Sequence, residues 1–412
     1  LEAGVIGAMA AVAIMPFELE PSVTVRGLNG DLLAELRPIP ASISELKEAI
    51  AAQAGIPATM QVLVREGSDE ALGCEELGEA SLDITMIVDE EPVLRGVARL
   101  ASEVPSGQEE ILRAMRSRGE LDLNGKSIGP AGADAVAEAL LLRCGMLRHL
   151  DIGGNPICSF GAQALSSALA NNSSLTSLQL GRTCLGYKGA ESIARALEVN
   201  SSLMSLDIGC NVIGPNGCKA IAAALQKNRS LRALRLGFNY VGDAGAEALA
   251  APLGAGSALT SLDIDSNSIS DEGSKALAAA LETNSSLTSV DLNGNCIGPE
   301  GARSLAGALA KASATSVKAL HLGCNELGFE GAEAIAALLA REPDPLLLEL
   351  SLGYSDIGDE GALAVAAALV TNSTLQVLYL GSESSPRSLD AMGRLEAASA
   401  RSPRCAPLEL RW

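Results

Sequence analysis

The sequence predicts an α/β solenoid shaped like a horseshoe, with a parallel inner sheet and outer helices, preceded by a small α+β domain. Three observations lead to this fold class. A unit of about 28 residues recurs, it opens with alternating apolar and polar residues, and it continues into an apolar stripe of helical spacing. In one unit Leu206 and Ile208 flank Asp207, while Ile221 and Leu225 lie at helical spacing. Since one unit cannot bury its apolar side alone, the units must stack.

The start of the chain is apolar from Gly4 to Phe17, with no basic segment before it. A signal peptide needs a charged start, and a membrane-spanning helix needs about 20 apolar residues. We therefore expect residues 1–19 to form a disordered leader.

Residues 20–90 have the pattern of a small mixed domain. A hairpin with a turn at Asn29 and Gly30, a helix that ends near Gly55, and two further strands follow in order. The hairpin, the helix that runs into AGIP and the strand in VLVREG resemble those of ubiquitin-like β-grasp domains. The resemblance implies a docking module rather than a modifier, because an acidic segment stands where ubiquitin has its diglycine tail.

The repeats are expected over residues 119–382, between a linker with a capping helix (91–118) and a helical C-terminal cap (383–412). Ten strands are predicted, and their first apolar residues lie 28 to 30 residues apart. These residues are Leu121, Leu150, Leu178, Leu206, Leu234, Leu262, Val290, Leu320, Leu350 and Leu378.

Each strand opens the pattern L-x-[LI]-G-x-N-x-[IL]-G-x-x-G-A, followed by a helix rich in Ala and Leu. On this motif the chain resembles leucine-rich repeats of the ribonuclease-inhibitor type. That form also occurs in the sensor domains of NOD-like receptors and in Ran GTPase-activating proteins. The resemblance implies a protein-binding solenoid. The G-x-x-x-x-G-K-[ST] loop that a complete NOD-like receptor needs for nucleotide binding is absent from the sequence.

Asparagine recurs in two columns of the repeat. The first follows the strand, where a buried amide can bond the backbone groups that a turn leaves unpaired. Its members are Asn155, Asn211, Asn239, Asn267, Asn295 and Asn325. The second carries N-glycosylation sequons just past the helix, where asparagine tolerates a left-handed cap conformation, so we interpret it as structural. Its members are Asn171, Asn172, Asn200, Asn228, Asn284 and Asn372.

Composition excludes several classes of partner and site. A net charge of −20 argues against a nucleic-acid groove and against an anionic membrane surface. Nine cysteines without a CxxC pair favour free thiols and a cytoplasmic location over disulfides or zinc. The two histidines, His149 and His321, fall six predicted strands apart, about 29 Å at strand spacing. We therefore predict no enzyme, no cofactor and no metal.

Side chains between the two strand leucines are predicted to face the concave side. Asp263 and Asp265 lie beside Asp291 on adjacent strands, where they suit either a cation or, as we favour, the Lys and Arg side chains of a partner. Aromatic residues in the loops after the strands either pack between repeats or anchor an interface. The candidate partner-binding residues are Asp151, Asp207, Arg235, Asp263, Asp265, Asp291, His321, Tyr379, Phe238, Tyr240 and Tyr354.

The sequence thus predicts a non-catalytic scaffold or sensor that binds a protein with a basic surface. Two alternatives follow from the resemblances. One is a regulator of a small GTPase, similar to Ran GTPase-activating proteins, and the other is an adaptor of the ubiquitin system.

Overall fold

The described part of the chain falls into two units. The computed structural model describes residues 9–14, 23–27, 32–36, 61–65, 84–88, 119–142, 147–311, 316–342, 345–381, 389–401 and 408–411. One unit is Leu1–Arg99 with Leu142–Gly145, and the other is Leu100–Leu141 with Met146–Trp412. The capping helix expected before residue 119 lies outside the described residues.

The first unit contains a five-stranded antiparallel sheet in the order β3-β2-β1-β5-β4. Its strands are β1 (Met9–Ile14), β2 (Val23–Gly27), β3 (Leu32–Leu36), β4 (Gln61–Arg65) and β5 (Ile84–Val88). The two strands of the predicted hairpin pair with each other as β2 and β3.

The described strands do not show the predicted β-grasp domain. The helix expected before Gly55 lies outside the described residues, and β1 lies between β2 and β5. This strand also falls within residues 1–19, for which a disordered leader is expected. A short apolar run suits a strand with a neighbour on each side, and β1 pairs with both β2 and β5.

The second unit is built on an eleven-stranded parallel sheet, in which the strands follow one another in chain order from β6 to β16. Its three-residue strands are β6 (Glu120–Asp122), β7 (His149–Asp151), β8 (Ser177–Gln179), β9 (Ser205–Asp207), β10 (Ala233–Arg235), β11 (Ser261–Asp263), β12 (Ser289–Asp291), β13 (Ala319–His321), β14 (Glu349–Ser351), β15 (Val377–Tyr379) and β16 (Glu409–Arg411). The middle residues align across the sheet, as Leu234 does with Leu206 and Leu262. Ten of the strands lie where the repeat spacing predicts them.

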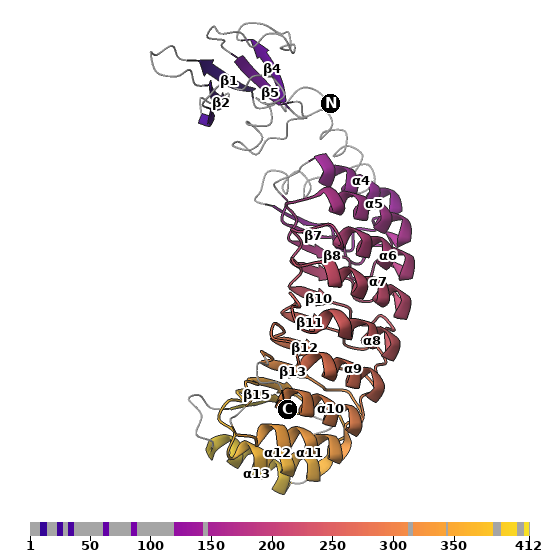
Figure 1. Cartoon of the computed structure of the whole chain (residues 1–412), viewed down its shortest axis with the longest axis vertical. Coiled ribbons are helices and arrows are strands. Elements are labelled where there is room, and N and C mark those ends of the chain that lie inside the picture. Colours follow the sequence, from indigo (N-terminus) through magenta and orange to yellow (C-terminus); the bar gives the residue numbers. More distant parts are fainter. Residues whose placement is uncertain are drawn as a thin grey trace. The chain divides into compact units, whose positions relative to one another are not determined.

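A helix follows each strand from β6 to β15, and neighbouring helices pack on one another. The helices are α4 (Pro130–Leu142), α5 (Cys158–Asn171), α6 (Gly186–Leu197), α7 (Gly214–Lys227), α8 (Gly242–Leu253), α9 (Asp271–Leu281), α10 (Pro299–Lys311), α11 (Gly328–Leu339), α12 (Gly358–Leu369) and α13 (Leu389–Arg401). Figure 1 shows the strands of this unit on its inner side and the helices on its outer side. Because helices are about 10 Å wide and strands about 4.8 Å apart, the stack curves toward the sheet. None of the helices in the described residues has the length and apolar character needed to cross a membrane.

The first asparagine column is buried, as predicted, and its amides bond the backbone of two repeats. Asn239 has no exposed surface, and its Nδ2 donates to the carbonyls of Ile208 and Leu236, each at 2.9 Å. Its Oδ1 accepts from the N–H of Asn211 at 2.9 Å. Where Thr183 replaces asparagine, its hydroxyl still donates to the carbonyl of Leu180. The column therefore ties each turn to its neighbour.

The second asparagine column forms a similar ladder at the other end of the helices, but for a different reason from the one predicted. Asn228 has extended backbone angles, φ −69° and ψ 133°, so the left-handed cap expected there is wrong. Its side chain is buried instead, with Nδ2 donating to the carbonyl of Leu197 at 2.8 Å and Oδ1 accepting from the N–H of Leu231 at 2.8 Å. Asn171 is the exposed member of this column. The requirement for a buried amide explains the recurring sequons.

The C-terminal cap differs from the single helix that the sequence predicts. After α13, the segment Glu409–Arg411 adds β16 to the end of the sheet, where Leu410 pairs with Leu378. This strand replaces β15 as the edge of the sheet, and its shortness and its two charged residues, Glu409 and Arg411, are features that discourage edge-to-edge pairing.

Candidate functional site

A trough crosses the concave face where the strands end. Its floor is a column of glycines that follow the second strand leucine in four successive repeats: Gly153, Gly181, Gly209 and Gly237. The same column holds Asn124 one repeat before them and Asp265 one repeat after them, and these side chains close the two ends. Because these glycines have no side chains, a concavity of about 400 Å³ lies above them.

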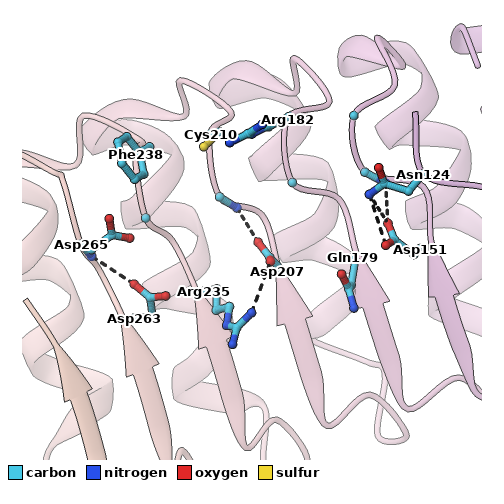
Figure 2. A pocket seen from close by; sticks show the side chains of 15 residues that line it. Asn124, Asp151, Gln179, Arg182, Asp207, Cys210, Arg235, Phe238, Asp263 and Asp265 are labelled. Atoms are coloured by element: carbon cyan, nitrogen blue, oxygen red, sulfur yellow. Dashed lines mark hydrogen bonds and ion pairs between the residues drawn. The ribbon is translucent and has the colours of Figure 1, made fainter. Parts of the chain in front are cut away.

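Two rows of side chains border this trough. The inner row, here called the wall, consists of the last residues of β7 to β11, which Figure 2 shows standing side by side: Asp151, Gln179, Asp207, Arg235 and Asp263. The outer row, here called the rim, lies in the loops after the floor and consists of Gly154, Arg182, Cys210 and Phe238. The trough is therefore polar and charged along the wall, and partly apolar along the rim.

The aspartates of the wall column bond their own backbone. Oδ1 of Asp207 accepts from the N–H of Gly209 at 2.8 Å, and Oδ1 of Asp151 accepts from Gly153 in the same way at 2.8 Å. Asp263 makes the corresponding bond to Asp265 at 3.2 Å. This Asx-type turn is a structural reason for aspartate in the column. It uses one oxygen of each carboxylate.

Cations and amides compensate part of the wall charge. Arg235 Nη1 lies 4.0 Å from Asp207 Oδ2, and the arginine side chain is 68% exposed. Nδ2 of Asn124 donates to both carboxylate oxygens of Asp151, at 3.2 and 3.3 Å. With four aspartates and two arginines around the trough, the lining keeps a net negative charge.

Asp263 and Asp265 lie at the far end of the trough, and Asp291 lies on the next strand, outside it. A Cβ placed on Gly237 would lie 1.8 Å from Asp265 Oδ1, so Asp265 reaches over the floor of the preceding repeat. Burial and a hydrogen bond with Asp263 raise the pKa of Asp265 to about 6. Burial also raises the pKa of Asp291, although the N–H of Asn293 and nearby His321 act against it. Within the described residues, no group of three or more His, Cys, Asp or Glu side chains is arranged to hold a metal ion.

The predicted residues His321 and Tyr379 belong to a second cluster, toward the C-terminal end of the sheet. His321 Nε2 lies 3.8 Å from Glu349 Oε1, and the rings of His321 and Tyr379 have centroids 6.4 Å apart. Arg411 of β16 stacks over Tyr379 at 4.9 Å and donates to its hydroxyl. Arg411 is not among the residues predicted from the sequence, because the repeat pattern is too degenerate there to predict the last strand.

The predicted aromatic residues of the loops are exposed, but only one of them lines the trough. Phe238 is 57% exposed and borders the trough, whereas Tyr240 and Tyr354, 66% and 46% exposed, lie outside it. All three have φ near +56°, a left-handed conformation that is unfavourable for bulky residues. These loops therefore hold large aromatic side chains in solvent, although the backbone conformation costs roughly 1 kcal/mol at each of the three residues.

Six of the eleven predicted residues line the trough: Asp151, Asp207, Arg235, Asp263, Asp265 and Phe238. The others are Asp291 on the next strand, the pair His321 and Tyr379, and the outlying Tyr240 and Tyr354. Sequence reasoning missed Asn124, Gln179, Arg182 and Cys210. The signal was the column of glycines after the second strand leucine, interrupted at Asn124 and Asp265, because such a column leaves a groove between its neighbours.

Comparison with known proteins agrees with the repeat architecture. A family model described as "Leucine Rich repeat" matches residues 171–194, 199–222, 227–250, 258–278, 283–306, 313–336 and 344–366. The chain is similar to the solved structure of the leucine-rich repeat-containing protein LegL7 from Legionella pneumophila. The two are 23% identical with a TM-score of 0.45, and the match covers 69% of this chain and 88% of that one. It is also similar to the structure titled Leiomodin-1 Actin-Binding Site 2. That match has 22% identity and a TM-score of 0.29, and it covers 35% of this chain and 78% of that one.

No curated protein sequence matches the chain. The recurring family match and the eleven parallel strands with their outer helices lead to one conclusion: the chain contains a leucine-rich-repeat solenoid.

Proposed function

We propose that the repeat region is a non-catalytic scaffold that binds a protein partner on its concave face, with the trough at the centre of the contact. The observation that carries this proposal is the trough itself. A hollow of about 400 Å³ has half-buried carboxylates along one side and an exposed phenylalanine along the other. Concave sites with a few polar groups and an apolar anchor are the usual form of binding sites.

Charge supports a partner with a basic surface. The chain carries a net charge of −20, and Asp207, Asp263 and Asp291 project from the concave face. Such a field attracts a cationic partner over roughly 8–10 Å at ordinary salt and raises its association rate. We extend the contact to Asp291, His321 and Tyr379 along the sheet, and to Tyr240 and Tyr354 on the loops.

A reducing compartment, such as the cytoplasm, fits this function. The cysteines that the structure describes are free: Cys158, Cys184, Cys210, Cys218, Cys296 and Cys324. Exposed thiols in several loops persist where disulfides are reduced. The GTPase-regulator and ubiquitin-adaptor alternatives stay predictions from resemblance, since no feature of the described residues favours either.

The test compares proteins captured from a lysate by three forms of the full chain. The first is wild type. The second has Asp207, Asp263 and Asp291 changed to Asn, which keeps an oxygen for the turn hydrogen bond. The third, a matched control, has Glu191, Glu247 and Glu333 of the outer helices changed to Gln.

The proposal expects a specific set of proteins bound by wild type and by the control, lost from the Asp-to-Asn form, and weakened as salt rises. Equal capture by all three forms would place the partner elsewhere. Loss of the captured proteins from the control form alone would place the partner on the convex side.

A further inference from the structure

The width of the trough limits what can enter it. Asp207 on the wall and Cys210 on the rim are three residues apart in the chain, so their Cα atoms are at most about 10 Å apart. Side chains from both rows narrow the space further. An α-helix with its side chains is about 10–12 Å wide, which is too wide to reach the floor. An occupant that contacts the glycines is therefore a single extended chain.

The floor does not offer an edge for strand addition. Peptides that add as a strand pair with the unpaired edge of a sheet, whereas this trough crosses the middle strands. The carbonyls of Gly181, Gly209 and Gly237 already accept hydrogen bonds from N–H groups in the loop of the preceding repeat, at 2.8 to 2.9 Å. The occupant must therefore be a chain that needs no ladder of backbone hydrogen bonds. Polyproline II is such a conformation, because its backbone stays solvated.

The spacing of the wall charges matches that conformation. Asp151, Asp207 and Asp263 lie on alternate strands, β7, β9 and β11, so successive carboxylates are about 9.6 Å apart at the usual strand spacing. Polyproline II has three residues per turn and rises about 3.1 Å per residue, so every third side chain points the same way at about 9.3 Å intervals. Cations at every third residue would therefore meet the three aspartates in register.

The remaining lining residues suit the rest of such a segment. Arg182 and Arg235 are exposed donors on the rim and wall, and the free carbonyls of a polyproline II backbone are their natural acceptors. Phe238 offers an exposed aromatic face at the rim, the surface on which proline-rich segments pack. Arg235 stands on the strand between Asp207 and Asp263, with Nη1 4.0 Å from Asp207 Oδ2, so a cation of the segment shares the Asp207 carboxylate with this arginine.

From this geometry we propose that the trough binds an extended, polyproline II segment of a partner protein, with Lys or Arg at every third position. The inference rests on the proposed function and specifies the chemistry of the partner. It is confined to the trough, and so excludes Asp291, which lies beyond Asp265.

The probe is a fluorescent peptide of three Lys-Pro-Pro repeats, titrated with the full chain and followed by fluorescence anisotropy. One control peptide has the same residues with its lysines in succession, and another has Glu in place of Lys. We expect the spaced peptide to bind at least about fivefold more tightly than the clustered one at ordinary salt, and the acidic one not to bind. Equal affinity for the two basic peptides would overturn the proposal, because it would show that the peptides bind by charge attraction alone and that the spacing of their lysines has no effect. No binding of the spaced peptide up to about 1 mM would overturn it as well.

Three variants locate the site. Asp207→Asn keeps the turn hydrogen bond and should lower the affinity for the spaced peptide by about fivefold. Gly181→Ala adds a methyl group whose carbon lies no closer than 3.6 Å to neighbouring atoms, so the fold is preserved. The methyl group raises the floor of the trough, and the affinity for the spaced peptide should fall by a similar factor. Glu247→Gln on the outer helix α8 is the control, because it removes one exposed charge away from the concave face. It should change affinity by less than about twofold.

Equal loss of affinity from Asp207→Asn and Glu247→Gln would contradict a trough site, as would unchanged binding by Gly181→Ala. These results are separate from the capture experiment. If the Asp-to-Asn form loses its partner while the spaced peptide fails to bind, the concave-face function stands and the polyproline II inference is wrong.

Discussion

At the scale of single residues, the two asparagine columns show how a repeat protein satisfies backbone groups that its turns leave unpaired. Asn239 lies just after a strand and Asn228 just after a helix, and both are at most 5% exposed. Each bonds carbonyls and N–H groups of its own repeat and of its neighbour. A buried amide that bridges repeats is therefore needed at both ends of the helix.

Asn239→Ala and Asn228→Ala should each lower the free energy of unfolding by about 1–3 kcal/mol, because each leaves several buried groups unpaired. Asn171→Ala is the control, since Asn171 is exposed and donates only to Ser167 in its own helix; it should change the free energy by less than about 0.5 kcal/mol. Urea unfolding followed by circular dichroism measures the three values. If Asn228→Ala behaves like Asn171→Ala, the second ladder contributes little.

Asp265 makes stability depend on pH. Its pKa is about 6 in the folded chain, against about 3.9 in an unfolded one. Between these values the folded state holds more protons than the unfolded state, so stability decreases as pH rises from about 4 to about 6. The charged form of Asp265 is thus a cost that the folded protein carries at neutral pH.

Asp265→Asn should therefore be more stable than wild type at pH 8, by about 1 kcal/mol after allowance for solvent screening. The difference should disappear near pH 4, where folded wild type is protonated. Thermal unfolding at both pH values measures this, with Glu247→Gln on α8 as the control for loss of one charge. A difference that is the same at both pH values would show that the effect is not titration.

At the scale of elements, glycines set how closely the outer helices pack. A Cβ on Gly217 of α7 would lie 2.8 Å from Ile213 Cβ and 3.0 Å from Ala190 Cβ of α6. A Cβ on Gly307, in the second half of α10, would have no heavy atom within 4 Å. The same amino acid therefore has opposite roles in two helices of one stack.

Gly217→Ala should destabilise the protein by about 1–3 kcal/mol, because it forces α6 and α7 apart. Gly307→Ala should instead stabilise it, by about 0.5–1 kcal/mol, since it removes the entropy cost of glycine within a helix. Midpoints of thermal unfolding compare the two variants. Shifts of the same sign would show that the helices do not approach as closely as described.

At the scale of the whole molecule, free thiols are the property that bears most directly on where the protein works. All nine cysteines should react with a thiol reagent after denaturation without prior reduction. In the folded protein Cys218 should stay unreacted, because it is buried and burial raises the pKa of its thiol to about 12. Recovery of seven or fewer thiols after denaturation would indicate a disulfide and an oxidising compartment.

The sequence by itself determined the repeat unit, the positions of ten strands and the first asparagine column. These features follow from local patterns, because the alternation around Leu206 and the helical spacing of Ile221 and Leu225 depend only on nearby residues. The last strand was missed because Glu409–Arg411 has no repeat motif, and only its pairing with β15 identifies it.

The tertiary structure alone decided which side chains form one site. Asp207 and Arg235 are 28 residues apart, and the trough exists because lateral register aligns four glycines across β7 to β10. The second asparagine ladder likewise depends on the helix of the preceding repeat, whose carbonyl Asn228 reaches. Contacts between repeats depend on register and on the curvature of the stack. Those are set by packing, whereas the period of the sequence sets only the unit that is packed.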